Sequence, residues 1–186
     1  MNGHATQDEK SVGKGFPRQP RLNKNYVSSE NDPVLNEEWF VHVIKDKLAN
    51  HPDNSFEYPF YGEKIFDEPM VGFVRGDDPL LYRYKQIIGP RHFTPEESMR
   101  WQAEKNNVPA PKAEDLSVVS FVMPITRITK DDNANRTDWV SERWAQTRLI
   151  GEIFSQTFVR EIVTDLMNMG ILAISPDVTP LFTKKR

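Results

Sequence analysis

The stretch of residues 116–175 constrains the fold more than any other part of this sequence. Residues 117–125 form a near-continuous apolar run, which is typical of a strand buried on both faces. A polar loop over 126–137, a long helical pattern over 138–169 and a second apolar segment at 171–174 follow. Strand, loop, helix and strand in this order form the unit from which layered sheets are built. We therefore expect a layered α/β (α+β) fold.

The long helix carries a wide apolar stripe at helical spacing. The stripe consists of Ile150, Phe154, Phe158, Ile162 and Leu166, widened by Leu149, Ile153, Val159 and Val163. At 1.5 Å per residue a helix of this length spans roughly 45 Å, so we expect a bend, near Gly151. Gly170 is expected just beyond the C-cap of the helix.

Shorter elements are expected before this unit: helices over 36–50, 79–88 and 94–106, and a strand over 70–74. Asn36 and Asp78 are predicted N-caps, and Thr94 with Glu97 forms a predicted capping box.

Two apolar groups are expected to join the core. One is a helical stripe of Leu81, Tyr84 and Ile88. The other consists of the aromatic residues of the irregular connection over 52–69, namely Tyr58, Phe60, Tyr61 and Phe66.

The chain is expected to have two parts. Residues 1–30 show no apolar period and are rich in Gly, Asn, Ser, Lys and Pro, which favours a disordered or loosely draped arm. Residues 31–186 are expected to form one domain, incomplete at its C-terminal end because the sequence stops about ten residues after the 171–174 segment. An incomplete layer leaves a strand edge and a helix face uncovered, so the isolated chain should form a homodimer, bind hydrophobic dyes or aggregate.

Composition excludes several kinds of site within these residues. The sequence has no cysteine, so it offers no disulfide and no thiolate ligand for a metal or cluster. The net charge of −3 argues against a nucleic-acid surface over the whole chain. The N-terminus has no apolar signal core and the longest apolar run is too short to span a bilayer, which predicts a cytoplasmic protein that is not in the membrane.

No catalytic or metal-binding constellation stands out. The four histidines share no ligand spacing, which favours surface or capping roles over a metal site. The acidic pairs Asp77–Asp78 and Asp131–Asp132 are better explained as a helix cap and loop turns than as paired catalytic acids.

The best candidate binding site is the segment over 126–143. It follows the apolar strand and enters a helix N-terminus, where backbone N–H groups attract anions. Basic and amide residues cluster there, and we assign a candidate cofactor or phosphate site to Arg127, Asn135, Arg136 and Arg143, with Lys130, Asn133, Trp139 and Trp144 around it. An ordinary solvated connection is an equally weighted alternative.

The order of phrases along the chain carries a family resemblance. The phrases are Phe66-Asp67-Glu68-Pro69, Val71-Gly72-Phe73, Asp77-Asp78-Pro79-Leu80, His92-Phe93-Thr94-Pro95-Glu96-Glu97, Ser117-Val118-Val119-Ser120-Phe121, Trp144, Arg148, Gly151-Glu152 and Pro180-Leu181-Phe182. Over residues 66–182 the chain resembles the N-terminal half of the epoxyqueuosine reductase-like iron–sulfur proteins of anaerobic bacteria, which are distantly similar to reductive dehalogenases.

The resemblance implies a domain similar to the nitroreductase-like, cobalamin-binding type, followed in full-length members by a ferredoxin-type portion with two 4Fe-4S clusters. The implied chemistry is reduction of an organic substrate, a modified tRNA base in the best-known branch, and cobalamin stays open as a second cofactor. The cluster cysteines and the family's catalytic phrases are not in this sequence, so no catalytic residue is carried over.

Two hypotheses about function follow. In the first, the chain is the N-terminal scaffold and cofactor-pocket portion of such a reductase, inactive alone, with the ferredoxin-type portion or an electron-donor protein as its partner. In the second, it is a self-contained binding or accessory module for an anionic ligand or a protein partner.

Overall fold

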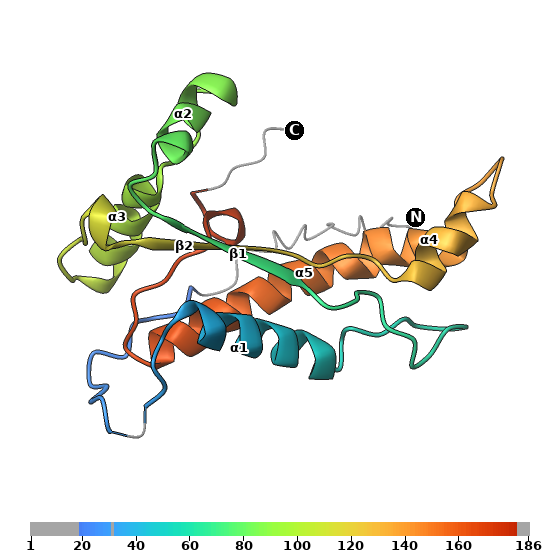
Figure 1. Ribbon diagram of the computed structural model, residues 1–186, viewed down its shortest axis with the longest axis horizontal. Coiled ribbons are helices and arrows are strands. Elements are labelled where there is room, and N and C mark those ends of the chain that lie inside the picture. The colour runs from blue at the N-terminus through green and yellow to red at the C-terminus, as the bar shows by residue number, and fades with distance from the viewer. Residues whose placement is uncertain (1–18, 31, 182–186) are drawn as a thin grey trace, which may run out of the picture.

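A computed structural model describes residues 19–30 and 32–181 of the chain. Within these residues the helices and strands, in order, are α1 (Glu37–Asn50), β1 (Met70–Arg75), α2 (Pro79–Ile87), α3 (Pro95–Asn106), the short 3-10 helix η1 (Ala113–Asp115), β2 (Ser117–Val122), α4 (Arg127–Ala134), α5 (Glu142–Asn168) and the 3-10 helix η2 (Pro176–Val178). The fold is therefore a mixed α+β fold, and Figure 1 shows α1 and α5 below the two strands with α2 and α3 at one end.

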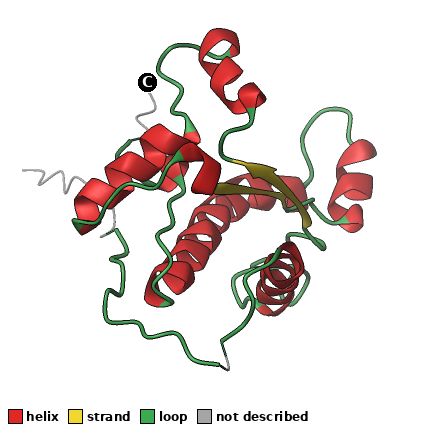
Figure 2. Ribbon diagram, turned by 60° about the vertical axis from the view of Figure 1, so that its left-hand side comes forward, coloured by secondary structure: helices red, strands yellow, loops and turns green. Residues whose placement is uncertain are grey.

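The two strands form an antiparallel sheet. Met70 lies opposite Val122 and Arg75 lies opposite Ser117. The prediction of a strand–helix–strand unit around the long helix was wrong, because residues 171–174 form no strand. They run along α3 instead, where the Gln102 side chain donates a hydrogen bond to the Ala173 carbonyl at 2.9 Å. Figure 2 shows these residues as loop.

The apolar run of β2 is not buried on both faces, contrary to expectation. Val119 and Phe121 pack against the core, while Val122 is 56% exposed. Side chains of a strand alternate between its faces, and here helices cover only one of them. The strand ends at Val122 rather than at Ile125.

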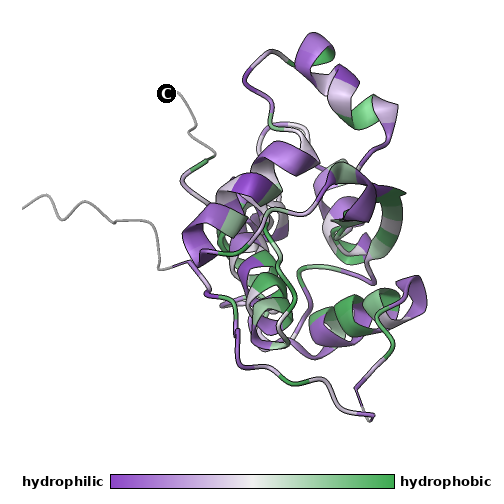
Figure 3. Ribbon diagram, turned by 90° about the vertical axis from the view of Figure 1, so that its left-hand side faces the viewer, coloured by the Kyte–Doolittle hydropathy of each residue, from purple (hydrophilic) through white to green (hydrophobic). Residues whose placement is uncertain are grey.

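The core lies between α1, α5 and the inner face of the sheet. Its buried residues are Ile44, Leu48, Phe56, Ile65, Phe66, Phe154 and Phe158. Phe158 contacts rings on two sides, with centroids 5.9 Å from Phe121 and 5.7 Å from Phe154. In Figure 3 the apolar colour is concentrated in the lower half of the molecule, where α1 and α5 lie.

Helix α5 starts later than predicted and carries a narrower buried stripe. Ser141 is its N-cap, accepting a hydrogen bond from the Trp144 N–H, and the helix continues without interruption through Gly151. Leu149 and Ile153 are exposed, so their assignment to the stripe was wrong. Gly151 is buried against Phe66, whose ring would lie 3.0 Å from an added Cβ; this close approach, rather than a bend, explains the glycine.

The end of α5 follows the predicted chemistry. Gly170 has φ +75°, and its N–H donates to the Met167 carbonyl while the Ile171 N–H donates to Leu166. These two bonds form a Schellman motif. The predicted caps Asn36 and Asp78 and the Thr94–Glu97 capping box are confirmed as well.

Two predicted core groups are only partly buried. Helix α2 has no buried residue and Ile88, just beyond its end, is exposed, because α2 projects from the body at the top of Figure 1. In the 52–69 connection Phe66 is buried, but Tyr58 and Tyr61 are exposed and contact each other. Phe56, which was not among the residues expected in the core, is buried there.

The described part of the N-terminal arm, residues 19–30, is tied to the body. The Leu22 N–H donates to the Asn106 side chain at 2.8 Å, and the Asn23 N–H donates to the Met167 carbonyl at 2.9 Å. This segment thereby lies across the ends of α3 and α5. Residues 1–18, the rest of the predicted arm, lie outside the described residues.

Candidate functional site

The predicted anion-binding segment is mostly helical. Residues 127–134 form α4 rather than a loop, because Thr126 caps its first turn: the Thr126 hydroxyl accepts from the Thr129 N–H and lies 2.9 Å from the Thr129 hydroxyl. The strand before it is antiparallel to its neighbour, so the parallel-sheet argument for a ligand at this edge does not apply.

Three of the four predicted site residues lie along α4 and the turn that follows it. Arg127 is 86% exposed and pairs with Asp131 at 3.2 Å, one helical turn away. Arg136 pairs with Asp132 at 3.7 Å. The Asn135 side-chain amide donates to the Asp131 carbonyl at 2.9 Å, so it closes the end of the helix.

Arg143, the fourth residue, is held by contacts on every side. Its Nε and Nη2 donate to the two carboxylate oxygens of Glu63, both at 3.0 Å, and Nη1 donates to Asp132 at 3.3 Å. The guanidinium lies 3.8 Å from the centroid of the Phe60 ring. Only 19% of the Arg143 side chain is exposed. A bidentate pair that also stacks on a ring is a strong arrangement for arginine.

The electrostatics of this pair favour the charged forms. The hydrogen bonds from Arg143 lower the pKa of the Glu63 carboxyl below its ordinary value of 4.5, and those bonds raise the pKa of Arg143. Each of the three predicted arginines faces a carboxylate, so an added anion would have to compete with that carboxylate. The arrangement performs a structural task, joining the 52–69 connection to α5.

The histidine and paired-acid candidates also have structural contacts. His51 Nε2 lies 3.1 Å from a Glu161 carboxylate oxygen, and its ring contacts Phe154. Asp77 accepts two hydrogen bonds from Arg75, and Asp78 accepts one from the Leu80 N–H as the cap of α2.

Among residues 19–30 and 32–181, no group of three or more His, Cys, Asp or Glu side chains is placed to hold a metal ion. The chain does not fit an iron–sulfur cluster, because thiolates are the usual ligands and the sequence has no cysteine. In the same described part of the chain, no helix has the length and apolar character needed to cross a bilayer.

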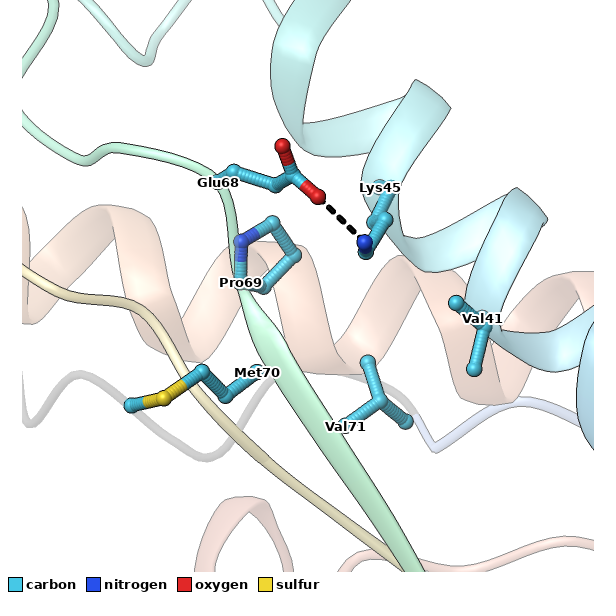
Figure 4. A pocket seen from close by; sticks show the side chains of 6 residues that line it. All are labelled: Val41, Lys45, Glu68, Pro69, Met70 and Val71. Atoms are coloured by element: carbon cyan, nitrogen blue, oxygen red, sulfur yellow. Dashed lines mark ion pairs between the residues drawn. The ribbon is translucent and has the colours of Figure 1, made fainter.

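A first pocket lies between α1 and β1, with a volume of about 480 Å³. Figure 4 shows Val41 and Val71 on its two walls and the ion pair between Lys45 and Glu68 across it. The two charged groups of this pocket therefore pair with each other, and Val71, one of its lining residues, packs against the core.

A second pocket was missed by sequence reasoning. It measures about 1030 Å³ and lies between α3 and the arm segment, lined by Trp101, Gln102, Lys105, Asn106, Arg21 and adjoining residues of both chain ends. Trp101 and Lys105 are four residues apart on a helix, a spacing that places them on one face and could have signalled the site. Nothing in the sequence placed Arg21 beside them.

Comparison with known proteins identifies no relative. No family model, no curated protein and no solved structure matches the chain.

The likeness to epoxyqueuosine reductase-like proteins consequently stays a prediction. So do the 4Fe-4S and cobalamin expectations and the cytoplasmic location, which none of these contacts tests.

Proposed function

We propose that the chain is a non-catalytic scaffold whose open two-stranded sheet is completed by a further polypeptide. The partner we propose is the cysteine-bearing, ferredoxin-type portion of an iron–sulfur reductase. The resemblance of residues 66–182 to epoxyqueuosine reductase-like proteins supports the choice of partner. The exposed outer face of the two-stranded sheet supports the role as a scaffold.

The observation that carries the proposal is the uncovered outer face of the sheet. Its cross-strand pairs are Met70 with Val122 and Gly72 with Ser120. Met70 is 63% exposed and Val122 is 56% exposed. Gly72 and Ser120, the other pair named here, are exposed as well. Sheets of two strands are marginal unless they gain strands or cover, and an apolar pair without cover favours a contact surface.

The edge of the sheet formed by β2 is suited to receive another strand. Figure 4 shows β1 between α1 and β2, so the edge away from α1 belongs to β2. The strand, Ser-Val-Val-Ser-Phe-Val, contains no charge and no proline, the two features that commonly protect an edge from pairing. A partner strand here would extend the sheet and shield Val122.

The roles that we propose for the chain and for its partner follow from the residues that the chain contains. This chain would supply the core and one wall, and the partner would supply the cluster ligands and the electrons. No step of the reduction is assigned to these residues.

Site-specific photo-crosslinking tests the proposal cleanly, because a cysteine introduced into this cysteine-free chain is unique. Ser120→Cys, on the outer face, carries the crosslinker; Ser28→Cys, an exposed serine outside the sheet, is the matched control. In extracts of the native cells, the Ser120 variant but not the Ser28 variant should capture a polypeptide whose peptides contain Cys-x-x-Cys-x-x-Cys runs.

Three outcomes would overturn it. One is crosslinking of the Ser120 variant to a second copy of the chain, which would make the face a homodimer interface. The others are capture of the same proteins by both variants and no capture by either.

A further inference from the structure

The pocket beside α3 has a fixed polar floor. Gln102 is 2% exposed, and its amide nitrogen donates to the Ala173 carbonyl at 2.9 Å. Asn106 donates to the Gln102 backbone carbonyl at 2.9 Å and accepts from the Leu22 N–H at 2.8 Å. These bonds hold the arm segment against α3, so the pocket exists before any ligand arrives.

One acceptor on this floor, the side-chain oxygen of Gln102, has no donor among residues 19–30 and 32–181. This oxygen keeps some accessible surface, because Arg160 Nε is the one fully buried side-chain nitrogen or oxygen of those residues that has no partner. An accessible amide oxygen on the floor of a pocket can accept a hydrogen bond from a ligand N–H group that reaches it.

The walls are basic and aromatic. Arg21 and Lys105 line the pocket, and neither forms an ion pair with an acidic side chain of residues 19–30 or 32–181. Lys105 Nζ lies 5.5 Å from the centroid of the Trp101 ring. The Lys24 ammonium is bonded to the Asn107 carbonyl nearby, which adds positive charge at the end of α3.

We infer that this pocket binds a small aromatic anion that carries an N–H donor. The ring would lie on Trp101, the phosphate or carboxylate between Arg21 and Lys105, and the N–H group would donate to the Gln102 oxygen. Each part of the ligand answers one feature of the pocket: stacking area, positive charge and an open acceptor. The inference does not depend on the proposed partner of the sheet.

Titration calorimetry with defined probes tests it. Adenosine monophosphate and 4-aminobenzoate represent the phosphate and carboxylate sources. Among the incomplete analogues, adenosine lacks the anion, benzoate lacks the N–H donor, and inorganic phosphate lacks both the ring and the N–H donor. At least one of the first two should bind about tenfold or more tightly than its incomplete analogues. Whichever of the two binds more tightly identifies the anionic group that the pocket prefers.

Matched variants assign the binding to this pocket. The double variant Arg21→Gln/Lys105→Gln should weaken the tighter probe about tenfold. The control Arg83→Gln/Lys130→Gln removes one arginine and one lysine that are exposed elsewhere, and should leave affinity unchanged. Trp101→Leu should remove the advantage of the ring-bearing probe over inorganic phosphate.

The inference is overturned if neither probe binds, if inorganic phosphate binds as tightly as the better probe, or if the control variant weakens binding as much as the pocket variant.

Discussion

The two basic regions of this molecule differ in whether carboxylates of the described residues pair with their cations. At the α4–α5 junction Arg127, Arg136 and Arg143 each face a carboxylate. Beside α3, Arg21 and Lys105 line a pocket and form no ion pair with the described acidic residues. The junction has the higher density of basic residues in the sequence, yet its charges are used within the fold.

The difference shows that the number of cations is a poor guide to an anion site. What matters is whether a carboxylate lies within a few ångströms, since a close opposite charge cancels most of the local potential. At the junction, Arg143 joins the 52–69 connection to α5 through its hydrogen bonds to Glu63. In the α3 pocket, no carboxylate of the described residues pairs with Arg21 or Lys105.

The largest effect is expected from the core that both regions share. Phe158→Ala removes a fully buried ring from α5 and should lower the free energy of unfolding by about 3–5 kcal/mol, measured by urea denaturation. Ile153→Ala, on the exposed side of the same helix, should change it by no more than about 0.5 kcal/mol. Similar losses of stability in both variants would contradict the assignment of Phe158 to the buried face of α5 and of Ile153 to its exposed face.

A smaller effect is expected from the junction. Arg143→Gln removes hydrogen bonds to Glu63 and Asp132 and should cost about 1–2 kcal/mol, a figure reduced for its partial exposure. Arg127→Gln, which loses a surface pair, should cost less than about 0.5 kcal/mol in the same denaturation experiment. Equal losses of stability in the two variants would mean that Arg143 contributes no more to the fold than an exposed ion pair does.

The junction should also respond to acid. Because Arg143 lowers the pKa of Glu63 in the folded state, the pair stabilises the fold above the ordinary pKa of 4.5, and this contribution is lost as the pH falls through the lowered folded-state pKa. The stability difference between the wild type and Glu63→Gln should therefore be constant near neutral pH and shrink in acid. A difference that grows in acid would contradict the pairing.

The smallest effect is expected at the pocket. Among residues 19–30 and 32–181 the Lys105 ammonium lies over the Trp101 ring and pairs with no carboxylate, so Lys105→Gln should change the free energy of unfolding by about 0.5 kcal/mol. A thermal or urea melt measures this directly. A loss as large as that of Arg143→Gln would give Lys105 a structural role and weaken the case for a ligand.

Local chemistry was predictable from the sequence. The caps Asn36 and Asp78, the Thr94–Glu97 box and Gly170 form as expected, because each depends on groups a few residues apart. The pairing of Arg127 with Asp131, four residues apart on α4, was not predicted, because residues 126–137 were expected to form a loop.

Long-range partners were not predictable. The residues 171–174 have an apolar pattern like that of a strand, but the Gln102 side chain binds their backbone and β2 pairs with β1 instead. Similarly, nothing near Arg143 in the sequence indicates Glu63, which lies 80 positions earlier. The same limit concealed the α3 pocket, whose walls come from both ends of the described chain.

The most direct test of the contrast between the two regions is a pair of titrations of ¹⁵N-labelled protein, one with adenosine monophosphate and one with 4-aminobenzoate, each followed by backbone amide shifts. The account predicts that at least one of the two probes causes saturable shifts around Arg21, Trp101 and Lys105, with residues 127–143 unchanged. Shifts centred on residues 127–143, or no saturable shift in either region with either probe, would contradict it.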